Sequence, residues 1–228
     1  PFYGNGNEGG MAIALDASGN VYTTGILNAT ADLDTGIGNY NLSSAGIGNH
    51  DGYISKLNAL GDFVWAKQLG GAVGSELFIS SIVIDADSNV YTLGNFSQTV
   101  DFNPGPGTYN LTSSGSYDVF ISKLDNVGNF VSTIQFAGLA FDDGRSLTLD
   151  NAGNIIATGN FKATSDFDPQ AGVFNLTSNG ADDIFIIKLQ NELGSSTSIN
   201  ENSWNNMVNL YPNPTTGALT IESDKIFE

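Results

Sequence analysis

The sequence lacks cysteine and is poor in basic residues. Its 228 residues include 7 Lys and Arg against 24 Asp and Glu, which gives a formal net charge of −17. The absence of cysteine excludes disulfide bonds, a thiol nucleophile and cysteine-ligated zinc or iron–sulfur sites. The excess of acidic residues argues against DNA, RNA and anionic membranes as partners, because their phosphates would repel the chain.

Long apolar runs and common catalytic motifs are also missing. The longest nearly apolar stretch, residues 77–84, is far shorter than the ~20 residues that span a bilayer. The only histidine, His50, has no second histidine for a zinc site and is expected in a solvated loop. There is no Walker or Gly-x-Ser-x-Gly motif, and no Gly-x-Gly-x-x-Gly opens a predicted helix. Because 40% of the residues are hydrophobic, the composition predicts a soluble, acidic, turn-rich globular protein rather than a disordered chain.

The strongest signal is an internal repeat of about 65 residues. A block that reads Asp-x-x-(Gly/Ser)-Asn begins at Asp16, Asp85 and Asp150, so the offsets are 69 and 65 residues. A second block, Asp-x-(Tyr/Phe)-Ile-x-Lys-Leu, follows in each copy. Matching blocks in one order, three times over, are not an accident of composition.

Each copy is predicted to be β throughout. In the middle copy, residues 77–85 are rich in Ile and Val, and a turn separates them from residues 90–93. Two further apolar runs follow at 119–124 and 130–135, and no stretch shows a sustained helical period. The apolar residues run together, as they do in strands that are covered on both faces. We therefore expect four antiparallel strands per copy and one long insertion, residues 95–117 in the middle copy.

This pattern favours an all-β fold, a partial β-propeller of three four-stranded antiparallel blades. A β-sandwich would not repeat its sequence so closely, and a β-solenoid coil is shorter. The predicted copies span about 1–70, 71–137 and 138–194. Since propellers close with four to eight blades, three blades are expected to leave apolar faces open and to self-associate. The first residue, Pro1, and the strand-like last residues lead us to expect a fragment cut at both ends.

These blocks resemble the repeat of the bacterial SBBP family, whose units read roughly D-x-x-G-N-x-Y-x-x-G … D-F-D … D-x-F-x-x-K-L. The resemblance covers residues 8–194 and implies a β-propeller. Two positions depart from the pattern. Leu33 stands between Asp32 and Asp34 where the other copies carry Phe, and Ser88 replaces the turn glycine.

The C-terminal segment has a different composition. Residues 195–206 are predicted to form a polar linker, and residues 207–228 two short strands around a turn with two prolines. Leu210 to Ile221 resembles the start of the type A C-terminal sorting domain of the type IX secretion system of Bacteroidota. The resemblance implies a truncated β-sandwich-type sorting domain and the type IX machinery as a partner. It also implies a location outside the cell or at the outer-membrane surface.

One pair of oxygen-bearing side chains recurs in the insertion of each copy. Because alternate residues of an extended segment point the same way, both oxygens of a pair could face a hard cation such as calcium. Calcium takes six to eight oxygen ligands, whereas each copy shows only two and lacks the EF-hand spacing. The alternative is an Asx turn that closes the loop. The candidate calcium ligands are Asp32, Asp34, Asp101, Asn103, Asp166 and Asp168.

The remaining charged residues suggest architecture rather than catalysis. Asp51, Asp118 and Asp183 recur with a lysine five residues later, so we expect the aspartates to bind turn amides and the lysines to end a strand. Asp142 and Asp143 form an acidic pair, with Glu8 and Glu76 roughly in phase in the other copies. A catalytic residue is normally unique among repeats, so no catalytic or cofactor-binding residue is predicted.

The sequence thus favours a non-enzymatic, secreted or cell-surface module that binds an extracellular protein or glycan. Two alternatives remain open. One is a calcium-assisted, lectin-like carbohydrate binder, given the acidic loops. The other is a piece of a propeller enzyme, a hydrolase or lyase, with its catalytic groups in other blades.

Overall fold

The fold is known from a computed structural model, which describes residues 2–4, 6–45, 49–169 and 172–190. These residues form strands, turns and loops and no helix, so the all-β prediction is confirmed. The predicted linker (195–206) and sorting domain (207–228) lie outside the described residues.

The described residues form sixteen strands, and the pairings between them are antiparallel. In chain order they are β1 (Tyr3–Gly4), β2 (Gly9–Leu15), β3 (Val21–Leu27), β4 (Thr30–Asp32), β5 (Asn41–Ser43), β6 (Asp51–Leu57), β7 (Phe63–Gly71), β8 (Glu76–Ile84), β9 (Val90–Ser97), β10 (Thr99–Asp101), β11 (Asn110–Thr112), β12 (Asp118–Leu124), β13 (Phe130–Gly138), β14 (Asp143–Leu149), β15 (Ile155–Asp166) and β16 (Asn175–Leu189).

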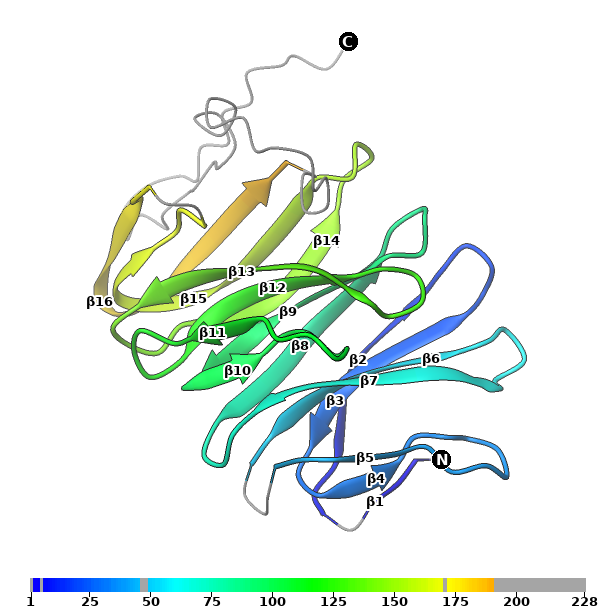
Figure 1. The fold of residues 1–228 in the computed structure, drawn as a ribbon. Coiled ribbons are helices and arrows are strands. Elements are labelled where there is room, and N and C mark those ends of the chain that lie inside the picture. The colour runs from blue at the N-terminus through cyan, green and yellow to red at the C-terminus, as the bar shows by residue number, and fades with distance from the viewer. Residues whose placement is uncertain (1, 5, 46–48, 170–171, 191–228) are drawn as a thin grey trace.

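The strands group into sheets that follow the sequence repeat. The first repeat has the order β2-β3-β6-β7, and the second has the equivalent order β8-β9-β12-β13. In the third repeat, β14, β15 and β16 pair in that order, and they take the places of β8, β9 and β12. Figure 1 shows the sheets side by side in chain order, from the blue and cyan first repeat to the yellow third. This arrangement is consistent with a β-propeller.

The repeated Asp-x-x-(Gly/Ser)-Asn block forms the turn between the first two strands of each sheet. In the second repeat, Asp85 Oδ1 accepts hydrogen bonds from the backbone N–H groups of Asp87 (2.9 Å) and Asn89 (2.8 Å). The Asn89 side chain donates to the other carboxylate oxygen at 2.8 Å. Equivalent bonds hold the turns at Asp16 and Asp150. The turn that the sequence predicted is therefore built by the aspartate.

The insertion of each copy contains structure that the sequence did not reveal. In the second repeat it forms the hairpin β10–β11, and β10 pairs with the end of β7 from the first repeat, Val100 opposite Gly71 and Asp101 opposite Gly70. Strand β15 pairs with the end of β13 in the same way. Strand β1 pairs with β4 in the corresponding place of the first repeat. The insertions of the second and third repeats thus bond to the outermost strand of the repeat before them.

The core lies between neighbouring sheets. Buried side chains of the first repeat, such as Tyr22 and Ile54, form one cluster with residues of β8 and β9. Tyr91 and Leu93 of the second repeat join the third in the same manner. Within the second repeat, Phe102 packs against Phe96 and Phe120 with ring centroids 5.3 and 4.8 Å away. The third repeat has an equivalent trio, Phe161, Phe167 and Phe185.

Replacing Ser88 by glycine is expected to stabilise the protein. Ser88 has a φ of 63° where the equivalent turn glycines, Gly19 and Gly153, have 78° and 80°. A side chain in the left-handed region costs ~1–2 kcal/mol, and the greater flexibility of unfolded glycine offsets part of the gain. We expect Ser88→Gly to raise the free energy of unfolding by about 0.5–1 kcal/mol in urea titrations. Gly153→Ser at the matching turn should lower it, and equal stabilities of all three proteins would contradict this account.

Candidate functional site

The predicted calcium ligands lie in loops that are closed by Asx turns. Asp101 Oδ1 accepts hydrogen bonds from the backbone N–H groups of Asn103 (2.9 Å) and Tyr109 (2.8 Å). Asp32 and Asp166 accept the two equivalent bonds in their own repeats. One oxygen of each first aspartate is therefore committed to the backbone, as the Asx-turn alternative requires.

In the first two repeats the second side chain of the pair also holds its loop. Asn103 Oδ1 accepts from the Gly105 N–H at 2.8 Å, and Asp34 Oδ1 accepts from the Gly36 N–H at 2.8 Å. Among the described residues, no group of three or more His, Cys, Asp or Glu side chains could hold a metal ion. Calcium binding by these loops stays a prediction.

The register between repeats places two of these loops beside polar grooves. The first junction groove, of about 300 Å³, lies between the first and second repeats, and the second junction groove, of about 350 Å³, lies between the second and third. Equivalent residues line them: Ala45, Gln68, Asp101, Asn103 and Pro104 in the first, and Ser114, Gln135, Asp166, Asp168 and Pro169 in the second. The sequence predicted the loop residues but not the glutamines that face them.

The glutamines tie each groove to a buried aspartate. Gln135 Nε2 donates to Asp118 Oδ2 at 2.6 Å and to the Thr112 carbonyl at 3.0 Å. Gln68 makes the equivalent bonds to Asp51 and to the Ser43 carbonyl. Burial raises the pKa of both aspartates, although the hydrogen bonds to their carboxylates oppose that shift. These bonds hold the glutamine of each groove in place.

The recurring aspartates and lysines have the architectural roles that the sequence predicted. Asp118 Oδ2 accepts from the Ser114 N–H at 2.8 Å, and Asp183 Oδ2 accepts from the Asn179 N–H at 2.7 Å. Lys123 Nζ lies 4.9 Å above the ring centroid of Tyr91, and Lys56 lies equally close to the Tyr22 ring. The third lysine, Lys188, forms an ion pair with Asp150 at 2.7 Å. These groups stabilise turns and strand ends.

Asp142 differs from the interpretation that treated it as part of a repeated acidic pair. The Asp142 N–H donates a hydrogen bond to the Tyr117 carbonyl. In the second repeat the Leu77 N–H donates the equivalent bond to the His50 carbonyl. The counterpart of Asp142 in the second repeat is therefore Leu77 and not Glu76. The buried carboxylate accepts from Ser165 Oγ at 2.7 Å and from the Lys162 N–H at 3.0 Å. Burial raises its pKa to about 6, and the negative charge of Asp118 acts in the same direction. Asp142 was named from the sequence, but its burial was missed because its counterpart in the second repeat was taken to be Glu76 rather than Leu77.

The prediction that His50 is a solvated loop residue is wrong. Its Nδ1 lies 3.1 Å from Glu76 Oε1, and its ring centroid lies 5.2 Å from that of Phe78. The Tyr117 hydroxyl donates to the other oxygen of Glu76. Glu76 thus links the first repeat to the second, a contact between distant residues that no local pattern indicates.

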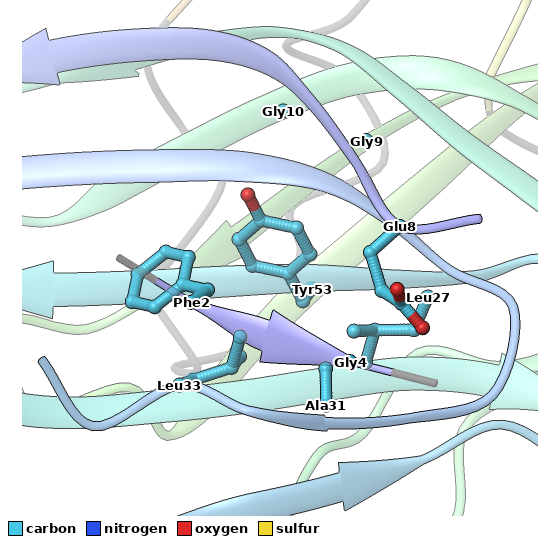
Figure 2. Close-up of a pocket in the computed structure, with 9 residues that line it drawn as sticks. All are labelled: Phe2, Gly4, Glu8, Gly9, Gly10, Leu27, Ala31, Leu33 and Tyr53. Carbon is cyan, nitrogen blue, oxygen red and sulfur yellow. The ribbon is translucent and has the colours of Figure 1, made fainter. Parts of the chain in front are cut away.

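The first repeat contains a pocket that its neighbours fill with aromatic rings. Leu27, Leu33 and Tyr53 occupy the places of the phenylalanine trio, and a cavity of about 430 Å³ opens beside them. Phe2 packs edge-on against Tyr53 at a centroid distance of 6.1 Å. Figure 2 shows Glu8 reaching toward Gly4 and Leu27 across the pocket. The substitution of Phe by Leu33 was the sequence signal for this pocket.

Comparison with known proteins agrees with the repeat. Residues 64–95 match the SBBP family model, described as a β-propeller repeat. This stretch runs from β7 to β9 and includes the Asp85 turn. The chain is also similar to an uncharacterized WD repeat-containing protein of Acanthamoeba polyphaga mimivirus, with 26% identity over 158 residues. That alignment covers 65% of this chain and 11% of the relative's length. None of the described residues forms a helix with the length and hydropathy needed to cross a membrane.

We expect Asp142→Asn to stabilise the protein at neutral pH. The pKa of Asp142 is about 6 in the native state, above the ordinary value of 3.8. Between pH 3.8 and 6 this carboxyl is therefore protonated more often in the native state than in the unfolded state. The contribution of Asp142 to stability is therefore largest below pH 4, falls as the pH rises to about 6, and is lower by up to ~3 kcal/mol above that. The variant removes this loss, while its amide oxygen still accepts a hydrogen bond.

The measurement is the free energy of unfolding by urea between pH 4 and 7. The variant should show a smaller decrease over this range than the unmodified protein. Asp182→Asn, at an exposed site in the third repeat, is the matched charge control and should leave the decrease unchanged. Parallel curves for the Asp142 variant and the unmodified protein would contradict the assignment.

Proposed function

We propose that this chain is a non-enzymatic interaction module, a partial β-propeller of three four-stranded blades whose junction grooves bind a partner protein. The observation that carries the proposal is the recurrence of one groove at two successive junctions, with equivalent side chains. Two equivalent sites in one chain suit a partner segment that contacts both at once. The β-propeller repeat match and the WD repeat-containing relative support the same class of protein.

The chemistry of the grooves favours an extended, basic segment of a partner. Asp101 lines the first junction groove, and Asp166 and Asp168 line the second, in a chain of net charge −17. Lys and Arg side chains of a partner would pair with these carboxylates, and the surrounding field would speed their approach. Pro104 and Pro169 stand at equivalent points of the grooves and keep these loops stiff.

We place this module outside the cell or on the outer-membrane surface, exported by the type IX route. The support is the segment from Leu210 to Ile221, which resembles the opening of a sorting domain. In this proposal the type IX machinery is a second, transient partner that binds the C-terminal segment during export. The grooves bind their partner protein after export.

A binding titration with a fluorescent Lys-rich peptide tests the groove proposal. We expect Asp168→Asn to weaken binding about three- to fivefold, because an exposed ion pair contributes up to ~1 kcal/mol. Asn103→Asp, which gives the first groove the acid of the second, should strengthen it by a similar factor. Both effects should shrink as salt is added. Asp182→Asn changes the net charge equally outside the grooves, so an equal effect of this control would mean nonspecific attraction and refute the groove site.

A calcium-assisted carbohydrate binder is the second candidate. It is favoured by the two carboxylates, Asp166 and Asp168, that line one groove. A glycan array with and without chelator separates the candidates. The lectin candidate expects glycan binding that a chelator abolishes and that Asp166→Asn weakens, together with heat release when calcium is added. The peptide-binding proposal expects a chelator to have no effect.

A further inference from the structure

Each sheet has two faces that play different parts at the junctions. The leading face of a repeat is the side turned toward the preceding repeat, and the trailing face is the side turned toward the next. The second repeat packs its strand β8 against β2 and β3, and the third packs β14 against β8 and β9. Both internal junctions thus join a trailing face to the leading face that follows it.

The leading face of the first repeat leaves apolar side chains in solvent. Ile13 is 69% exposed, whereas its counterparts Ile82 and Leu147, at the same register positions, are 5% and 4% exposed. Leu15, two residues further along β2, is also exposed, although the counterparts of Leu15 in the other repeats are partly buried. The pocket of Figure 2 opens on this same face.

The trailing face of the third repeat is likewise apolar. Ile184 is 45% exposed, whereas Val119, its counterpart in the second repeat, is fully buried by the third. Ile156 is half-buried, whereas the equivalent Tyr91 is fully buried. The described residues therefore have one unpaired face of each kind.

Side-chain sizes at the internal junctions show which faces fit each other. At the first junction a large leading residue meets a small trailing one, since a Cβ on Gly52 would lie 2.6 Å from Ile79. At the second junction the small residue is on the leading face, where Gly144 lies against Leu93 of the trailing face. The trailing face there also has the larger Val119 at the position that Gly52 holds in the first repeat.

The two unpaired faces repeat the second arrangement. Gly10 on the first repeat corresponds to Gly144, and Ile184 on the third corresponds to Val119. At these two positions the small residue again lies on the leading side and the large residue on the trailing side, although Thr158 takes the place of Leu93. Glu8 also corresponds to the buried Asp142, so the leading edges of the first and third repeats share an acid, a glycine and apolar residues.

We infer that the leading face of the first repeat binds the trailing face of the third repeat of a second copy of this chain. The contact continues the internal junctions, so it is head-to-tail, and it closes into a ring of copies or extends into a filament. In this contact Ile184 of the second copy enters the pocket beside Gly10 and Glu8. At the first internal junction Gly52 holds the equivalent position, beside Ile79 and Leu77. Burial of exposed isoleucine and leucine drives the association.

Sedimentation velocity of the whole chain over a wide range of concentrations tests this inference. The unmodified protein should associate as its concentration rises. Ile13→Asp, on the leading face, and Ile184→Asp, on the trailing face, should each raise the dissociation constant at least about tenfold, as loss of a central interface residue does. Ile37→Asp, at a fully exposed loop residue, is the matched control and should associate like the unmodified protein.

Mixing the two variants gives the decisive result. A head-to-tail contact joins the intact trailing face of Ile13→Asp to the intact leading face of Ile184→Asp, so the mixture should form dimers and stop there. Circular dichroism melts identify any variant that does not fold, and the other face then carries the test. A monomeric unmodified protein at every concentration would overturn the inference. So would unchanged association of Ile184→Asp, which would indicate contact between two leading faces.

Discussion

The structure depends on the burial of both faces of each sheet by its neighbours. A strand such as β9 points Val90 and Phe96 toward the preceding repeat and Tyr91 and Leu93 toward the next, and all four side chains are buried. A single sheet of this kind cannot keep either face from water, so its stability comes from stacking. The same constraint explains why the apolar residues run together in the sequence and why the grooves lie at junctions. It also explains why the outermost faces are apolar.

Features that local hydrogen bonds determine could be predicted from the sequence. The turns at Asp16, Asp85 and Asp150 were predicted because one aspartate satisfies the amides within four residues of itself. The strands on either side were predicted from another local signal, their continuous apolar runs. Features that join distant residues were missed. The hairpin β10–β11 pairs with a strand about thirty residues away, and Glu76 joins His50 to Tyr117, so neither has a local signature.

The candidate site shows the same division. The loop residues Asp101 and Asp166 were singled out from their spacing alone, and the Asx turns that they form are local. Their surroundings, Gln68 and Gln135, come from the preceding repeat, and only the register between repeats brings them close. The burial of Asp142 escaped prediction because its counterpart in the second repeat is a leucine. The counterparts of a residue such as Asp142 in the other copies can be identified only when the pairing of strands is known.

The pairing of β10 with the end of β7 has a consequence for how this protein melts. Gly70 and Gly71 end β7, the last strand of the first sheet, yet their ladder partners, Asp101 and Val100, belong to the second repeat. No cut between residues 70 and 71 separates two self-contained units, because it passes through a ladder that both share. When one sheet unfolds, the edge of the next sheet therefore loses hydrogen bonds, and neighbouring repeats unfold together. This strand exchange makes the cooperative unit longer than the period of the sequence.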